Sequence, residues 1–306
     1  MLSYTIRRIL LGIIALLGAS LIIFGMVHLT PGDPVKTMLK FHASSERVAE
    51  LRHELGLDQP LPKQYLDFLW GSLRGDFGKS LSTRRPVISE IAERFIPTIK
   101  LAFSGMGIAI FIGITAGVLA AAFKDTIIDE IVMVIAVAGV SIPSFWLGLM
   151  LIQLFVINLG WFPLTKGTGL RSLILPAISL GLLASAVIAR LTRSNMVEIL
   201  TTDYIRTARA KGLKDSLVLF KHSLRNALIP VVTIIGIQIG VLLGGTVVIE
   251  KVFAWPGLGR LLINAIYSRD YPLIQAIVLY MAAGFVLMNL MVDLLYAYLD
   301  PRIRYD

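Results

Sequence analysis

The sequence contains no cysteine, and charged residues make up only 16% of it. The lack of cysteine excludes disulfide bonds and thiol chemistry. Soluble domains carry about a quarter charged residues, so a chain this poor in charge does not fit that class. Hydrophobic residues make up 56% of the sequence, and several charge-free runs reach the about 20 residues that a helix needs to cross a bilayer. These features predict an all-α, polytopic membrane protein.

Ionisable residues are also absent from the depth of the apolar runs, which argues against a proton relay and against a secondary transporter working alone. An intramembrane enzyme that used Ser141 as its nucleophile would need a base beside it. The four histidines all lie at or outside the membrane edges: His28, His42, His53 and His222. The enzyme and the secondary transporter are therefore the weaker alternatives.

The sequence lacks one glycine of a nucleotide-binding motif that it otherwise resembles in part. The segment 75–80 ends in Gly-Lys-Ser, as a phosphate-binding loop does, but that motif needs a glycine where Leu73 stands. We expect no catalytic, cofactor or metal site in this chain. The net charge of +9 does not indicate nucleic acid either, because most of the excess lies in short loops beside the apolar runs.

Six membrane spans are predicted from the apolar runs: 9–29, 101–123, a run within 131–159, 173–189, 227–249 and 273–292. The first run is too long for a secretory signal and no clear small-residue cleavage site follows it, so we expect it to remain as a helix. Three regions result: 1–29 with the N-terminus and first span, 30–97 as an extracytoplasmic helical segment, and 98–306 as the core that holds the remaining five spans and the inner segment 190–226. Within the outer parts, short helices are expected over 42–57, 63–73, 86–95 and 258–266.

Basic residues predict that both termini are cytoplasmic. With the N-terminus inside, the inner segments carry two, one, eight and two Lys or Arg residues, whereas the two short outer loops carry two and three. This bias follows the positive-inside rule. The acidic loop 124–130 points weakly the other way.

The inner segment 190–226 holds the most informative pattern. Residues 207–211 favour a short basic helix, and Gly212 would end it as a C-cap. Composition alone leaves two interpretations open, a solvated positive loop and the docking site of an energy-supplying partner.

The sequence of this loop, Tyr-Ile-Arg-Thr-Ala-Arg-Ala-Lys-Gly at 204–212 and Lys-His-Ser-Leu-Arg-Asn-Ala-Leu-Ile-Pro at 221–230, resembles the B-type permease subunits of peptide ABC importers. The Glu, Ile and Pro of the general family signature are absent from it. Further segments resemble the same branch, in order along the chain: 28–34, 55–61, 75–78, 189–194, 255–259, 269–272 and 300–304.

The resemblance implies the type I ABC-importer fold and a place in a bacterial or archaeal cytoplasmic membrane. It implies four kinds of partner: a homologous second permease, two cytoplasmic ATPases that carry ATP and Mg, an extracytoplasmic substrate-binding protein, and the lipid membrane. Short peptides, as dipeptides or oligopeptides, are the implied cargo, with glutathione, nickel chelates and oligosaccharides as alternatives.

The resemblance also assigns residues. The ATPase-coupling loop, which forms a short helix in that family, would comprise Arg206, Thr207, Ala208, Arg209, Ala210, Lys211, Gly212 and Leu213. The small residues in it would allow close approach to an ATPase, and its cations would pair with acidic groups there. The outer segments 30–97 and 251–272 are expected to contact the binding protein, with Arg260, Arg269 and Asp270 as candidates.

Small residues and one proline mark the remaining candidates. Gly236, Gly240 and Gly244 repeat every four residues, a spacing that lets helix backbones approach in lipid. They would pack within this subunit, or else against a partner or along the pathway. Pro143 removes a backbone hydrogen bond within the third span, which predicts either a fixed kink or a moving hinge.

Overall fold

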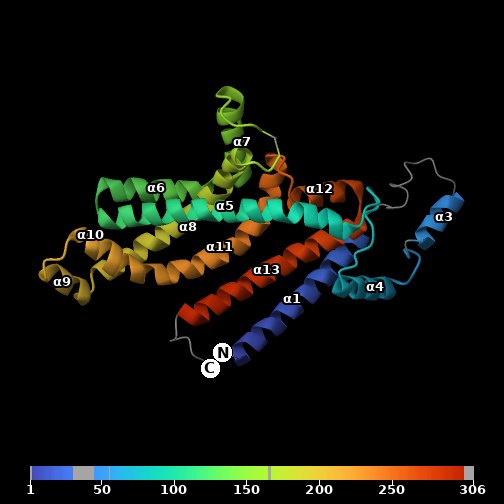
Figure 1. Cartoon of the computed structure of the whole chain (residues 1–306), viewed down its shortest axis with the longest axis horizontal. Helices are drawn as coiled ribbons and strands as arrows, with labels where there is room; N and C mark the ends of the chain where they lie inside the picture. The colour runs from blue at the N-terminus through green and yellow to red at the C-terminus, as the bar shows by residue number, and fades with distance from the viewer. Residues whose placement is uncertain (1, 30–44, 55, 165–166, 300–306) are drawn as a thin grey trace. The chain divides into compact units, whose positions relative to one another are not determined.

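A computed structural model of the chain describes residues 2–29, 45–54, 56–164 and 167–299. The motif residues at 30–34 and 300–304 and the start of the helix expected from residue 42 lie outside these ranges. The described residues contain no strand, and their helices are shown in Figure 1. They are α1 (Leu2–Leu29), α3 (Ser45–Glu54), α4 (Leu61–Arg74), α5 (Val87–Ala122), α6 (Ile127–Ser141), α7 (Ser144–Leu151), η1 (Ile152–Asn158), α8 (Leu170–Leu200), α9 (Asp203–Ala210), α10 (Asp215–Leu217), η2 (Val218–Leu224), α11 (Arg225–Val252), α12 (Leu258–Ser268) and α13 (Tyr271–Leu299).

Five of these helical stretches are long and apolar enough to cross a membrane, and a sixth span results if the bent pair α6 and α7–η1 is counted as one. The all-α membrane fold expected from composition is therefore present. The stretches are longer than the apolar runs predict. The second, for example, begins at Val87 and includes the amphipathic turns that were expected only to lead into it.

The third span differs from a straight helix. Helix α6 ends at Ser141, and the chain turns by 103° before α7 begins at Ser144. The break falls at Ile142 and Pro143, because proline cannot donate the hydrogen bond that would continue the helix. The Ser141 hydroxyl donates back to the Val137 carbonyl oxygen at 3.2 Å. The kink expected at Pro143 is thus present, and whether it moves remains a prediction.

The chain divides into two compact units. One comprises residues 98–255 with 291–306, and its core lies where α5, α7, α8 and α11 pack together around side chains such as Leu101, Leu180 and Ile188. In Figure 1, α6 runs beside α5 and α8 in this unit. Backbones touch at the α5–α8 crossing, because a Cβ at Gly181 would lie 2.3 Å from the Gly105 carbonyl oxygen.

The other unit comprises residues 1–97 with 256–290. Its core joins α1, the first turns of α5, α12 and α13 through buried residues that include Val27, Val87, Ile91, Leu258 and Ile277. Helices α4 and α12 correspond to the short helices expected over 63–73 and 258–266.

Candidate functional site: the loop between α8 and α11

The basic loop folds as a short helix that packs against the following segment of the same chain. Helix α9 begins at Asp203, four residues earlier than the pattern of residues 207–211 predicts. Ile205 and Ala208, three residues apart, share one face of the helix. They are buried against Val218 of η2, and Leu213 packs against the same small cluster. The seat is apolar, so α9 has a fixed orientation relative to the rest of the loop.

Two basic side chains of α9 are open to solvent. The side chains of Arg206 and Arg209 are 75% and 53% exposed. Arg206 Nη1 lies 3.5 Å from Asp203 Oδ1, and Arg209 Nε lies 3.8 Å from Asp215 Oδ1. Both aspartates are almost fully exposed. Exposed pairs of this kind contribute little, so the guanidinium groups can exchange these partners for carboxylates on another protein.

Two members of the predicted coupling set, Ala208 and Leu213, pack inside the loop. Ala208 is 8% exposed and faces Val218, so it packs inside the loop rather than on the outer face of α9. Ala208 lies three residues after Ile205, so both side chains project from the face of α9 that packs against Val218. Thr207, Ala210, Lys211 and Gly212 are exposed.

Gly212 ends the helix through its backbone conformation. Its φ is +75°, a region that residues with a Cβ rarely adopt. In that conformation its N–H donates to the Arg209 carbonyl oxygen at 2.9 Å, and Leu213 turns back to the buried cluster. A Cβ at this position would meet no atom within 4 Å. The glycine is therefore required by the turn and not by crowding within this chain.

Tyr204 ties α9 to the start of α11, a contact that sequence reasoning missed. Its hydroxyl accepts a hydrogen bond from Asn226 Nδ2 at 3.0 Å and donates to the His222 carbonyl oxygen at 3.4 Å. Both Tyr204 and Asn226 lie within the motifs quoted above, but nothing in their spacing indicates that they meet. A cavity of about 670 Å³ opens beside them and is lined by Lys221, His222 and Arg225 among others.

A second unforeseen contact lies at the end of α8 that leads into the loop. Arg193 Nε and Nη2 each lie 2.5 Å from an oxygen of Asp129, the third residue of α6. Asp129 also accepts from the Asp125 N–H at 3.2 Å. The pair places the α5–α6 turn and the start of the segment 190–226 at the same end of the unit. It also accounts for one acidic residue of loop 124–130, because Arg193 neutralises Asp129.

The glycine stripe of α11 divides between two environments. Gly236 lies against Val292, where a Cβ would approach Val292 Cγ1 to 2.2 Å, and Gly240 is buried. Gly244 is exposed, and a Cβ there would meet nothing within 4 Å. Part of the stripe therefore packs within the subunit, and the part around Gly244 is open.

The outer candidates also differ from one another. Arg260 and Arg269 are partly exposed, but Asp270 is fully buried. Its carboxylate accepts from Ser80 Oγ at 2.5 Å, from the Ser82 N–H at 3.1 Å and from the Leu273 N–H at 3.3 Å. The surface contact expected of Asp270 is therefore wrong for its side chain, which holds the loop after α4 against the start of α13.

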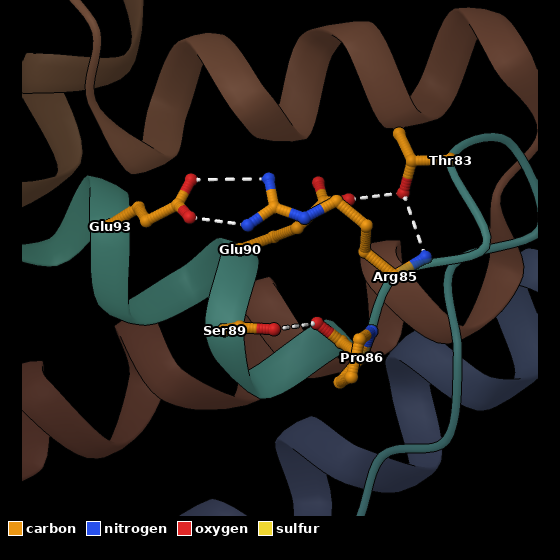
Figure 2. Close-up of polar contacts among 6 residues, drawn as sticks. All are labelled: Thr83, Arg85, Pro86, Ser89, Glu90 and Glu93. Carbon is orange, nitrogen blue, oxygen red and sulfur yellow. Dashed lines mark hydrogen bonds and ion pairs between the residues drawn. The ribbon is translucent and has the colours of Figure 1, made fainter.

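The same loop is fastened to the first turns of α5, as Figure 2 shows. The Thr83 hydroxyl donates to the nearly buried carboxylate of Glu90, and the Arg85 guanidinium forms a fork with Glu93. Ser89 Oγ donates to the Pro86 carbonyl oxygen at 2.7 Å. These bonds hold the loop between α4 and α5 against the first turns of α5.

Comparison with known proteins assigns the family. Residues 113–305 match the family described as "Binding-protein-dependent transport system inner membrane component", and residues 1–102 match its N-terminal counterpart. The chain is 47% identical over 305 residues to the glutathione transport system permease protein GsiC of Escherichia coli (strain K12), covering 100% of both proteins. The same protein of Salmonella choleraesuis (strain SC-B67) is also 47% identical over the full length.

Solved structures share the fold. Inward-facing MetNI, a methionine ABC transporter, matches with a TM-score of 0.59 and 20% identity, over 69% of this chain and 96% of that chain. An amino acid ABC transporter matches with a TM-score of 0.52 and 17% identity, over 70% of this chain and 94% of that chain.

Proposed function

The chain belongs to the binding-protein-dependent transport system inner membrane components, as a multi-pass permease of an ABC importer, and we propose that it conducts short peptides of the glutathione class. Its energy would come from separate ATPase subunits, because the segment that ends in Gly-Lys-Ser has Leu73 where a phosphate loop needs glycine. ATP and Mg would then be bound by those partners.

The proposal that separate ATPase subunits drive transport rests on the structure of α9. Two exposed basic side chains, an apolar seat made by Ile205 and Ala208, and a sharp end at Gly212 together form a rigid projection. Such a projection suits a groove with acidic rims on an ATPase. Arg206 and Arg209 would supply charge-assisted hydrogen bonds to carboxylates there.

Movement of α9 would pass to α11 through direct contacts. Tyr204 hydrogen-bonds to Asn226, the second residue of α11, and η2 continues directly into that helix. Closure of the ATPases would push α9 and thereby bias α11 toward one of two conformations. ATP would shift the population to the extent that it is bound more tightly in one conformation than in the other.

The remaining partners follow from the family. A homologous second permease would complete the pathway, and the open part of the glycine stripe at Gly244 is a candidate contact for it. An extracytoplasmic binding protein would dock on the outer segments, where Arg260 and Arg269 remain partly exposed. Asp270 would act there only by shaping the surface.

The proposed orientation places both termini in the cytoplasm. The excess of basic residues in 190–226 supports it. The Asp129–Arg193 pair adds support, because it brings the single-lysine turn at 124 to the same end as this basic segment.

Glutathione is the first cargo to test, since the full-length relatives with 47% identity are glutathione permeases. Other short peptides are the second choice, and nickel chelates and oligosaccharides are further alternatives. The test is to purify the chain in mild detergent from its native membranes with everything bound to it, and to identify the bound proteins by mass spectrometry. The copurifying binding protein is then titrated with glutathione and with a dipeptide set.

The coupling role is tested in the reconstituted complex with Gly212→Asp. We expect this variant to assemble but to lose transport, while ATP hydrolysis no longer responds to the loaded binding protein, because φ of +75° is strained for any residue with a Cβ. The matched control is Gly167→Asp, which alters a glycine with the same φ of +75° in another loop. Normal stimulated hydrolysis and uptake in Gly212→Asp would contradict the assignment of α9.

A further inference from the structure

Helix α4 packs along α1, the first membrane span. Gln64 Oε1 lies 3.1 Å from His28 Nε2, and the Tyr65 hydroxyl lies 3.0 Å from Ser20 Oγ. The ring of Phe24 lies between these levels, with its centroid 5.3 Å from that of Tyr65. These contacts use one side of α4 and fix its position against α1.

The contacts define how deep α4 lies in the membrane. His28 and Ser20 are eight residues apart, which corresponds to about 12 Å along a helix. Residues 5–29 form the span, so Ser20 lies about 14 Å from its Leu29 end, near the middle of a hydrocarbon core about 30 Å thick. Helix α4 therefore lies at the level of the half of α1 that ends at Leu29.

A second side of α4 is apolar and uncovered. Leu66, Trp70 and Leu73 are spaced i, i+4 and i+7, so they form one stripe. Their exposed fractions are 62%, 59% and 80%. The stripe is bordered by Lys63 and Arg74, and the Arg74 guanidinium carbon lies 4.5 Å from the centre of the Trp70 ring. Leucine and tryptophan with basic residues at the border is the composition of a helix that lies in a lipid interface.

The stripe leads into a cavity. A hollow of about 320 Å³ lies between α1, α4 and α13, with Leu16, Leu69, Phe77 and Tyr280 among its mostly apolar lining. Leu73 belongs both to this lining and to the stripe, so the two are continuous. The volume lies at the lower end of the about 300–1,000 Å³ found for ligand pockets, and the lining suits a hydrocarbon chain.

We propose that α4 is embedded in the leaflet at the Leu29 end of α1, and that a phospholipid acyl chain fills the cavity between α1, α4 and α13. The depth of α4, the uncovered stripe and the apolar cavity require an apolar occupant at the same place. Arg74, which follows the cavity-lining Leu73 and lies over Trp70, suits the phosphate of that lipid. The helix would anchor the outer segment to the membrane beside the docking surface of the binding protein.

The test uses the absence of cysteine, which allows single-cysteine variants with no background from this chain. Nitroxide labels at Leu66→Cys and Leu73→Cys are compared with Asp67→Cys, an exposed polar position on the same helix. The whole complex is placed in phospholipid vesicles, and accessibility to oxygen and to a water-soluble nickel chelate is measured by power saturation. We expect a several-fold higher oxygen-to-nickel ratio at 66 and 73 than at 67.

Two results would overturn the proposal. Free access of the nickel chelate to positions 66 and 73 would mean that the stripe faces an aqueous pathway. Low access of both reagents would mean that a protein, such as the second permease, covers the stripe. Native mass spectrometry of Ala283→Phe, which narrows the cavity, supplies a second measurement. We expect less retained phospholipid than in the unaltered complex, and equal retention would refute occupancy of the cavity.

Discussion

Truncating one partner of the ion pair between Asp129 and Arg193 is expected to destabilise the unit that carries α9. The Asp129 side chain is 5% exposed, and it is held by two bonds from one guanidinium. The Arg193 side chain is 28% exposed. The change we consider is Arg193→Ala, together with Asp129→Ala and the double variant.

The magnitude follows from what each truncation leaves behind. In Arg193→Ala, a buried carboxylate keeps only the N–H of Asp125, and removing one partner of a buried pair costs about 3–5 kcal/mol. In Asp129→Ala, the guanidinium is partly exposed and can regain water, so about 1–2 kcal/mol is expected. The double variant removes both charges. It should cost less than the sum of the single variants by about 2 kcal/mol, within the range of coupled neighbours.

The assay is thermal: the protein is heated in mild detergent, and the fraction that remains monodisperse on size exclusion is recorded. With about 2–4 °C per kcal/mol, Arg193→Ala should lower the midpoint by on the order of 10 °C. Arg190→Ala, one turn earlier on the same helix and exposed, is the control and should change it little. Additive effects of the two truncations, within about 0.5 kcal/mol, would refute the reasoning.

Two further outcomes are expected from the described contacts. Gly117→Ala should destabilise the protein, because its Cβ would lie 2.6 Å from the Ala189 carbonyl oxygen. The control is Gly107→Ala on the same helix, whose Cβ would meet nothing within 4 Å and which should stabilise the protein by about 0.5–1 kcal/mol through helix propensity. Thermal midpoints of the two variants that move in the same direction would contradict the close α5–α8 contact at Gly117. The hydrogen bond that His53 Nδ1 donates to the Asp58 carboxylate raises the pKa of His53 above its usual value. This exposed contact is therefore present below the ordinary histidine pKa of about 6.5 and is lost as pH rises through the raised value. Nuclear magnetic resonance titration of Asp58→Asn should return the His53 pKa to its usual value, and an unchanged titration would show that this contact is not its cause.

The membrane class and the helices could be predicted from the sequence alone. In lipid, every backbone polar group must be paired internally, and a helix pairs these groups within a single charge-free run of membrane length. Pro143 marks a break for a similarly local reason, since proline lacks the donor that continues a helix. The end of α9 at Gly212 was predictable because a positive φ is a property of the residue itself.

Only the tertiary structure decided which side chains meet. Asp129 and Arg193 are 64 positions apart, and Ser80 and Asp270 are 190 apart. No periodicity links such residues, so the burial of Asp270 could not be foreseen, and a polar residue in an outer loop was assigned to the surface. Ala208 shows the same limit at short range, because helical spacing places it beside Ile205, but only the packing against Val218 determines which face is covered. Local preferences depend on neighbours in the chain and are written in the sequence, whereas burial and long-range pairing depend on how the helices pack.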